Sequence, residues 1–255
     1  MEALLDVDAA VAAAALAPSP LLVAMDVDGT LSPLAPRADQ AALVPGAADV
    51  LATLVARGVP VAVVSGRGLD DLRQQFPWPD GLRLIGSHGL EDSAQHAVVP
   101  TAEERQRLQA VRTLAERAAA AVPGAWVEQK VAGVAFHYRQ AKPASKGSVA
   151  SQRLAERLAR LEKVWVRRGH LVLEASVRPG NKAEAVAWLR SEVGAGAVVF
   201  AGDDETDEDV FRAAAPSDVT VRVGPGETAA RYRVADPAEV IDLLGRIATV
   251  SASPT

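Results

Sequence analysis

Two carboxylates lie two residues apart directly after a short apolar run. The run covers residues 21–25, and residues 26–30 read DVDGT. While the chain stays extended, Asp26 and Asp28 point to the same side, and Gly29 lets the backbone turn closely around a ligand. We interpret the two acids as a functional pair at the end of a strand.

Two purely structural explanations of DVDGT are an Asp-Gly hairpin turn and a calcium-binding loop. A hairpin requires an alternating partner strand, but residues 31–33 read LSP and further prolines follow. A calcium loop requires more oxygen ligands at fixed spacing, and these are missing. The functional interpretation is therefore favoured over both.

A second apolar run, residues 59–64, ends in Ser65, Gly66 and Arg67. A hydroxyl group with neighbouring backbone N–H groups suits a phosphate oxygen. Ser-Gly is also common in ordinary turns, so this segment gains weight only beside the acidic pair. We expect all three residues to contact a phosphate-bearing substrate.

Lys182 stands at the start of an expected helix over residues 183–190, directly after Asn181, which suits the N-cap position. A lysine in the first turn opposes the helix dipole, which favours anions there. Its position is explained if it reaches toward an anion. The alternative is a solvated surface lysine.

Residues 202–209 read GDDETDED. Thr206 and Asp209 have the spacing of a capping box, and acids suit the first turn of a helix. Asp203 and Asp204 end a buried strand, where they would repel each other and the first acidic pair. A hard cation removes that repulsion, and Mg²⁺ prefers oxygen ligands. The sequence therefore predicts a magnesium site.

These residues follow apolar runs that alternate with helix-like stretches, which is typical of a parallel sheet covered on both faces. Ligands of such sheets bind beyond the carboxyl ends of the strands. The expected strands are residues 21–25, 59–64, 82–85, 197–201 and 219–223, with one helix that includes 50–55 and ends before Gly58 and another around 240–247. Residues 1–20 are expected to form a short helix or a loose tail.

The middle of the chain has a different pattern, in which a helix and two alternating strands occur twice. The expected helices are 101–121 and 146–161, and the expected strands are 126–131, 134–139, 163–168 and 171–176. This order predicts an antiparallel sheet backed by two helices. We therefore predict an α/β fold, a Rossmann-like doubly wound parallel-sheet core (21–90 and 179–250) with an inserted α+β cap domain (91–178).

Composition excludes several classes of function. The 255 residues carry a net charge of −5 and no dense run of Lys and Arg, so binding to nucleic acid or to acidic membranes is not expected. There are no cysteines, which excludes disulfides and thiolate chemistry and fits a cytoplasmic protein. No run approaches the ~20 apolar residues of a membrane span. The oligomeric state is left open.

Together the four segments resemble the haloacid dehalogenase-type phosphatase superfamily, from residue 21 to about residue 247. Within it the chain most resembles the trehalose-6-phosphate phosphatase family. Three stretches carry the closer resemblance: GSHGLE at 86–91, VEQK at 127–130 with HYR at 137–139, and GDDETDE at 202–208. The resemblance implies hydrolysis of trehalose 6-phosphate to trehalose and phosphate, with Mg²⁺ as cofactor and a small sugar phosphate as the partner.

The resemblance also implies a role for each core residue. Asp26 would attack phosphorus to form an aspartyl phosphate, and Asp28 would act as general acid and then general base. Ser65 and Lys182 would hold the phosphoryl oxygens.

Magnesium would be held by Asp26, the backbone carbonyl of Asp28, and Asp203. Asp204 and Asp207 would orient metal-bound water or the active-site lysine.

In the cap, alternation places polar side chains on one face of the expected strands. The resemblance implies that these bind the sugar: Glu128, Lys130, His137, Arg139 and Glu174. The alternative is a solvated sheet face.

Three other functions stay open: a phosphatase for another sugar phosphate, a catalytically inactive module that binds sugar phosphate, and a phosphotransferase or transport ATPase of the same superfamily. The inactive module is disfavoured because the chain retains four residues with expected roles in catalysis: Asp26, Asp28, Lys182 and Asp203. The acid at position 28 and the lack of a membrane domain disfavour the ATPase.

Overall fold

The computed structural model describes residues 6–94, 98–169 and 171–250. It divides the chain into two compact units, which we call the core unit (Met1–His96 with Asn181–Thr255) and the cap unit (Ala97–Gly180). Each is described by itself. In the described residues, no helix is both long enough and apolar enough to cross a membrane.

The core unit contains one sheet with the strand order β11-β10-β9-β1-β2-β3-β4. All neighbouring strands are parallel except β3 and β4, which are antiparallel. The strands are β1 (Leu21–Met25), β2 (Val61–Val64), β3 (Arg83–Gly86), β4 (Glu91–Asp92), β9 (Ala197–Gly202), β10 (Val219–Val223) and β11 (Tyr232–Val234). The predicted parallel sheet is confirmed.

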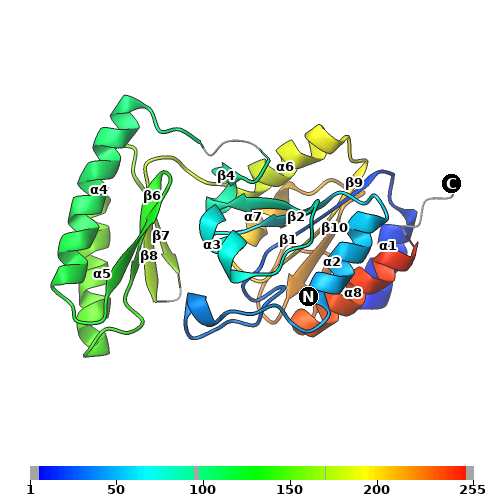
Figure 1. The fold of residues 1–255 in the computed structure, drawn as a ribbon, viewed down its shortest axis with the longest axis horizontal. Coiled ribbons are helices and arrows are strands. Elements are labelled where there is room, and N and C mark those ends of the chain that lie inside the picture. The colour runs from blue at the N-terminus through cyan, green and yellow to red at the C-terminus, as the bar shows by residue number, and fades with distance from the viewer. Residues whose placement is uncertain (1–5, 95–97, 170, 251–255) are drawn as a thin grey trace. The chain divides into compact units, whose positions relative to one another are not determined.

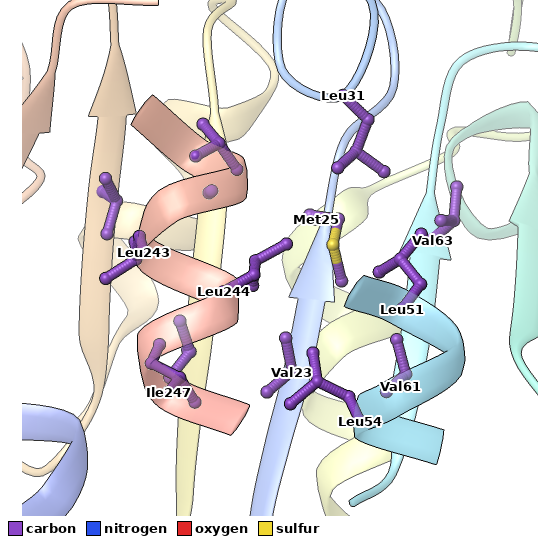
Figure 2. Close-up of a cluster of buried hydrophobic side chains, with 14 of the residues drawn as sticks. Val23, Met25, Leu31, Leu51, Leu54, Val61, Val63, Leu243, Leu244 and Ile247 are labelled. Carbon is purple, nitrogen blue, oxygen red and sulfur yellow. The ribbon is translucent and has the colours of Figure 1, made fainter. Parts of the chain in front are cut away.

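Helices cover both faces of this sheet (Figure 1), as continuous apolar strands require. One face packs against α1 (Val7–Leu16), α2 (Ala47–Ala56), α3 (Leu69–Gln75) and α8 (Pro237–Val250). The other face packs against α6 (Lys182–Val193) and α7 (Asp207–Ala213). Figure 2 shows how Leu51 and Leu54 of α2 meet Val23 and Met25 of the central strand in the first of these layers.

The cap unit contains a second, antiparallel sheet with the order β5-β6-β8-β7. Its strands are β5 (Trp126–Lys130), β6 (Gly133–His137), β7 (Trp165–Gly169) and β8 (Val172–Ser176). Its helices, α4 (Ala102–Ala120) and α5 (Ala144–Leu158), lie on one face of this sheet (Figure 1). The twofold helix-strand-strand pattern of the sequence is thus confirmed.

Among the α-helices and strands of the described residues, three were not expected from the sequence: α3, β4 and β11. Each is short, and β4 and β11 are edge strands of two and three residues. Since Glu91 and Asp92 extend the core sheet, the cap unit begins later than residue 91. Residues 7–16 form a helix that packs on the core sheet, so the core unit also begins earlier than residue 21.

Candidate active site

Three neighbouring strands bring their carboxyl ends together at the centre of the core sheet. Met25 of β1 pairs with Val63 of β2 and with Ala201 of β9. Asp26 follows Met25 directly, and its N–H donates to the carbonyl of Ala201 at 3.0 Å. Segments far apart in the sequence therefore meet at one edge, which is where parallel sheets bind ligands.

Lys182, the first residue of α6, is only 2% exposed. Its Nζ lies 2.8 Å from Oδ1 of Asp207, 3.0 Å from Oδ2 of Asp26 and 3.9 Å from Oδ1 of Asp204. Burial alone would lower the pKa of Lys182, but the three carboxylates raise it well above its ordinary value. Lys182 is therefore a permanent buried cation and not a solvated surface lysine.

Asn181 accounts for the local geometry of this lysine. Its Oδ1 accepts hydrogen bonds from the N–H groups of Ala183 and Glu184, as an N-cap residue does. The helix therefore starts at Lys182 and fixes the direction in which the side chain leaves the backbone.

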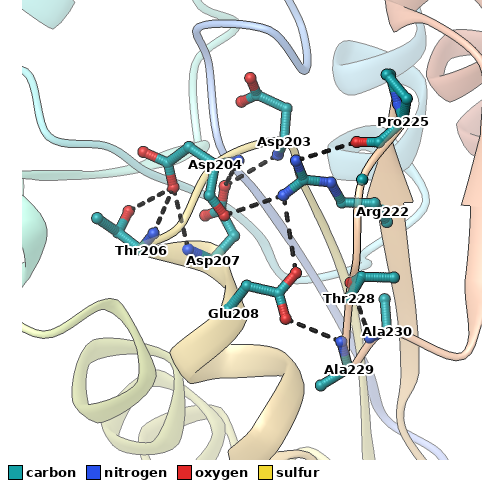
Figure 3. Close-up of polar contacts among 12 residues, drawn as sticks. Asp203, Asp204, Thr206, Asp207, Glu208, Arg222, Pro225, Thr228, Ala229 and Ala230 are labelled. Carbon is teal, nitrogen blue, oxygen red and sulfur yellow. Dashed lines mark hydrogen bonds and ion pairs between the residues drawn. The ribbon is translucent and has the colours of Figure 1, made fainter. Parts of the chain in front are cut away.

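The acidic turn after β9 is organised by its own carboxylates (Figure 3). Oδ2 of Asp207 accepts from the N–H groups of Asp203 and Asp204, each at 3.0 Å. Oδ1 of Asp204 accepts from the N–H and Oγ1 of Thr206 and from the N–H of Asp207. The expected capping box of Thr206 and Asp209 is wrong, because the Thr206 hydroxyl donates to Asp204 and makes no cap hydrogen bond.

A second layer of contacts holds this turn against β10. Nη1 of Arg222 donates to the carbonyl of Asp204 at 3.1 Å and lies 3.7 Å from Oε1 of Glu208. The other oxygen of Glu208 accepts from the N–H of Ala229 (Figure 3). These contacts hold the turn in place, and none of them involves the Asp203 side chain.

A cation fits between Asp26 and Asp203. Oδ1 of each is buried and has no hydrogen-bond partner among the described residues. Carboxylate oxygens of Asp26, Asp203 and Asp207 lie within 4.8 Å of one another, but both oxygens of Asp207 already serve Lys182 and the backbone. Unsatisfied buried carboxylate oxygens are the ligands that Mg²⁺ prefers.

Electrostatics favour a cation at the same place. Burial raises the pKa of Asp26 well above its ordinary value, against the opposing effect of Lys182. Burial, with repulsion from Asp207 and Asp204, raises the pKa of Asp203 to about 7. A divalent ion stabilises both charged forms. A Cβ added at Gly29, whose φ is +80°, would lie 2.1 Å from Oδ2 of Asp203, so only glycine fits beside this carboxylate.

Asp28 is half-buried and forms a bidentate pair with Arg67. Nε of Arg67 lies 2.6 Å from Oδ2 of Asp28, and Nη2 lies 2.8 Å from Oδ1. Nη1 of the same guanidinium donates to Asp71 at 2.6 Å. The guanidinium of Arg67 thus holds Asp28, and the expected contact of Arg67 with substrate stays a prediction.

Ser65 directly follows β2 and is buried, with Gly66 half-buried beside it. The Ser65 N–H donates to the carbonyl of Ile85 at the end of β3, and its Oγ accepts from the N–H of Arg67 at 3.3 Å. The loop 65–67 thus continues the strand edge that carries Asp26.

In the cap unit, strand pairing places Trp126, Glu128 and Lys130 on the same sheet face as His137 and Glu174. The imidazole Nε2 of His137 lies 2.9 Å from Oε2 of Glu128, and Nζ of Lys130 pairs with Glu174. Burial alone would raise the pKa of Glu128, but His137 and Lys130 lower it below the ordinary value.

Arg139 was expected on the same strand as His137. β6 ends at His137, and Arg139 lies in the exposed turn that follows. The sequence also gave no role to Trp126, whose indole stacks on the His137 ring with centroids 4.0 Å apart and an interplanar angle of 12°. Alternation alone could have placed Trp126 beside Glu128.

Comparison with known proteins gives one family. The trehalose-phosphatase family model matches residues 24–238. The trehalose-phosphate phosphatases of Mycobacterium marinum and Mycobacterium tuberculosis strain H37Rv are 34% and 36% identical, over 89% of this chain and 61% of each of those proteins. An uncharacterized glycosyl hydrolase of M. tuberculosis is 35% identical over 89% of this chain and 18% of its own length.

The chain thus spans about three fifths or less of the curated relatives that it matches. Among solved structures, the C-terminal domain of Candida albicans trehalose-6-phosphate phosphatase has a TM-score of 0.81, with 20% identity and 98% of each chain covered. The Aspergillus fumigatus trehalose-6-phosphate phosphatase has a TM-score of 0.63 at 25% identity, covering 98% of this chain and 99% of that one. The likeness to the Candida albicans domain, at 20% identity, supports the fold alone.

Proposed function

The chain belongs to the trehalose-phosphatase family, and from that premise we propose that it hydrolyses trehalose 6-phosphate to trehalose and inorganic phosphate. The observation that carries the proposal is the buried pair of Asp26 and Lys182, 3.0 Å apart, at the carboxyl edge of the core sheet. A buried carboxylate with one oxygen bound by a cation and the other without a partner among the described residues suits a nucleophile.

The first step is attack by Oδ1 of Asp26 on phosphorus. The new oxygen–phosphorus bond forms as the bond between phosphorus and the sugar oxygen breaks, which gives an aspartyl phosphate and the free sugar. Lys182 balances negative charge on the phosphoryl oxygens, and the hydroxyl of Ser65 donates a hydrogen bond to one of them. Lys182 also opposes the effect of burial on Asp26, which must be ionised to attack.

Asp28 moves the protons. Its carboxylic acid gives a proton to the leaving sugar oxygen, and the resulting carboxylate takes a proton from the water that attacks the aspartyl phosphate. The second step releases inorganic phosphate and restores Asp26. Arg67 holds the carboxyl group of Asp28 in one orientation through two hydrogen bonds.

A magnesium ion would be held by Asp26, the Asp28 backbone carbonyl and Asp203. When bound, it supplies positive charge that screens the phosphate and allows an anionic nucleophile to approach it. The orphaned Oδ1 of Asp203 supports this assignment.

The polar face of the cap sheet supplies recognition of the sugar in this proposal. Glu128 with His137, and Lys130 with Glu174, offer paired donors and acceptors, which is what a sugar diol requires. A phosphatase for another sugar phosphate would share the core and differ in these residues.

The experiment is phosphate release from a panel of sugar phosphates, with and without Mg²⁺. We expect release from trehalose 6-phosphate to exceed that from glucose 6-phosphate and sucrose 6-phosphate, and to require the metal. Asp26→Asn should abolish both turnover and any covalent phosphoenzyme. Faster release from another sugar phosphate would overturn the substrate assignment, and turnover by folded Asp26→Asn would overturn the mechanism.

A further inference from the structure

Three consecutive residues after β3 adopt left-handed backbone conformations. Ser87 has φ 49°, His88 has φ 55° and Gly89 has φ 105°. Non-glycine residues rarely adopt such conformations, and they persist only where the surrounding structure enforces them. The segment lies in the GSHGLE stretch, 86–91, to which the mechanism above gives no role. We call residues 86–90 the buttress turn.

The backbone of the buttress turn is bound to the phosphate loop 65–67. The N–H of Ser87 donates to the carbonyl of Arg67 at 2.7 Å, and the N–H of His88 donates to the carbonyl of Ser65 at 2.9 Å. A Cβ added at Gly86 would lie 2.7 Å from the backbone nitrogen of Leu69. The two backbones are therefore in direct contact, with no room for a side chain at residue 86.

Side chains also contribute to the contact between the buttress turn and the phosphate loop. A Cβ added at Gly66 would lie 2.7 Å from Cε1 of His88, so the imidazole packs directly over the centre of the phosphate loop. Glu91 links the buttress turn to the start of α3, since Oε1 accepts from the Ser87 hydroxyl and Oε2 accepts from the N–H of Leu69 at 3.4 Å.

The other side of the buttress turn meets the helix that carries the active-site lysine. A Cβ added at Gly89 would lie 3.0 Å from Cβ of Ala185 and 3.3 Å from the carbonyl oxygen of Asn181. Asn181 is the N-cap of α6, and Lys182 is its first residue. The turn therefore lies between the two elements that hold phosphate in the proposed mechanism.

We infer that the buttress turn, with His88 as its central positioning residue, sets the separation between the Ser65 loop and the start of α6. This inference rests on the proposed function of the same site. A left-handed turn keeps the chain short enough to contact both elements, and an extended backbone at Ser87 and His88 would carry the imidazole away from Gly66. The turn acts on phosphate through Ser65 and Lys182.

The test compares His88→Val with Lys163→Val. A β-branched residue resists the left-handed conformation, and Lys163, at φ 55° in the cap unit, provides the same strain outside the core unit. In folded His88→Val, the inhibition constant for inorganic phosphate should rise about tenfold to a hundredfold, and kcat/KM on a small aryl phosphate should fall by a similar factor. Lys163→Val should leave both unchanged while lowering Tm.

A double-mutant cycle tests the ring contact. Gly66→Ala should weaken phosphate inhibition, and His88→Ala should restore part of that loss when the two are combined, because it removes the ring that the new methyl group meets. Additive losses would overturn the contact as a determinant of loop position. Should His88→Val fail to fold, Glu91→Gln, which keeps size but loses one acceptor, should still raise the inhibition constant for phosphate.

Two quantities decide the inference: the affinity for phosphate and kcat/KM. Both are measured in each folded variant at His88 or Glu91, beside the wild type and the Lys163→Val control. If His88→Val and Glu91→Gln both fold and retain wild-type values, the turn serves stability alone. If the wild-type protein binds inorganic phosphate and hydrolyses aryl phosphate but not trehalose 6-phosphate, the proposed substrate fails while the inference about the turn is still tested.

Discussion

Both carboxylate oxygens of Asp28 accept hydrogen bonds from the guanidinium of Arg67, at 2.6 and 2.8 Å. This fork holds the proposed acid–base in one orientation and leaves a third guanidinium nitrogen for Asp71. A residue that the sequence suggested as a substrate contact thus orients the carboxyl group proposed to move the proton.

Arg67→Lys should therefore slow the enzyme most on substrates with poor leaving groups. An ammonium group cannot reproduce the fork, and one lost charged hydrogen bond is worth on the order of 1.5–3 kcal/mol. We expect kcat on trehalose 6-phosphate to fall roughly tenfold or more, with a smaller fall on p-nitrophenyl phosphate, whose leaving group needs little protonation. Equal falls on both substrates would mean that Arg67 acts on the phosphate instead.

Magnesium should stabilise the native protein measurably. A ligand that binds only the folded state raises the free energy of unfolding, by about 2.7 kcal/mol at a hundred times Kd. We expect Tm to rise with Mg²⁺ and fall again with EDTA, and Asp203→Asn to remove most of the rise. Asp209→Asn, which alters an exposed pair with Arg212, is the matched control and should respond like the wild type. An unchanged metal response in Asp203→Asn would place the ion elsewhere.

Removing the buried lysine should cost stability as well as activity. Lys182→Ala leaves Asp26 and Asp207 buried without their cation, a change that typically costs 3–5 kcal/mol. Urea denaturation measures it. Arg212→Ala removes a cation that is 62% exposed and should cost less than about 1 kcal/mol. Similar costs in the two variants would contradict the role of Lys182 as the central partner of the acidic site.

The cap residues should affect sugar phosphates selectively. Glu128→Ala removes the partner of His137, and we expect a loss of roughly tenfold to a hundredfold in kcat/KM on trehalose 6-phosphate. Hydrolysis of an aryl phosphate, which carries no sugar, should change little. Glu156→Ala, on the exposed side of α5, is the control. A loss shared by both substrates would assign Glu128 to the fold of the cap.

Acid should weaken the cap through Glu104. Hydrogen bonds from Arg178 and from the Thr101 backbone lower the pKa of Glu104 to about 2, well below the ~4.3 of an unfolded chain. The stabilisation is therefore fully present above about pH 4.3 and is lost as pH falls toward 2. The difference in Tm between wild type and Glu104→Gln should shrink over that window. Glu103→Gln, at an exposed neighbour on the same helix, is the matched control.

The sequence by itself determined the arrangement of the candidate site motifs. DVDGT, SGR and GDD each follow a continuous apolar run, and such runs form buried parallel strands whose carboxyl ends share one edge. The twofold helix-strand-strand pattern determined the cap in the same way, because helical and strand periodicities are local properties of the chain. The short edge strands β4 and β11 have too few residues to produce a periodic pattern.

Only the tertiary structure decided which side chains become partners. Arg67 could have met phosphate, yet its guanidinium meets Asp28, which lies 39 positions away. Asp207 could have bound metal, yet Lys182 and two backbone N–H groups occupy its oxygens. His88 lies over Gly66 because backbone hydrogen bonds hold it in a left-handed turn. Such choices depend on distances of a few ångströms between segments remote in sequence, and packing of the whole core sets those distances.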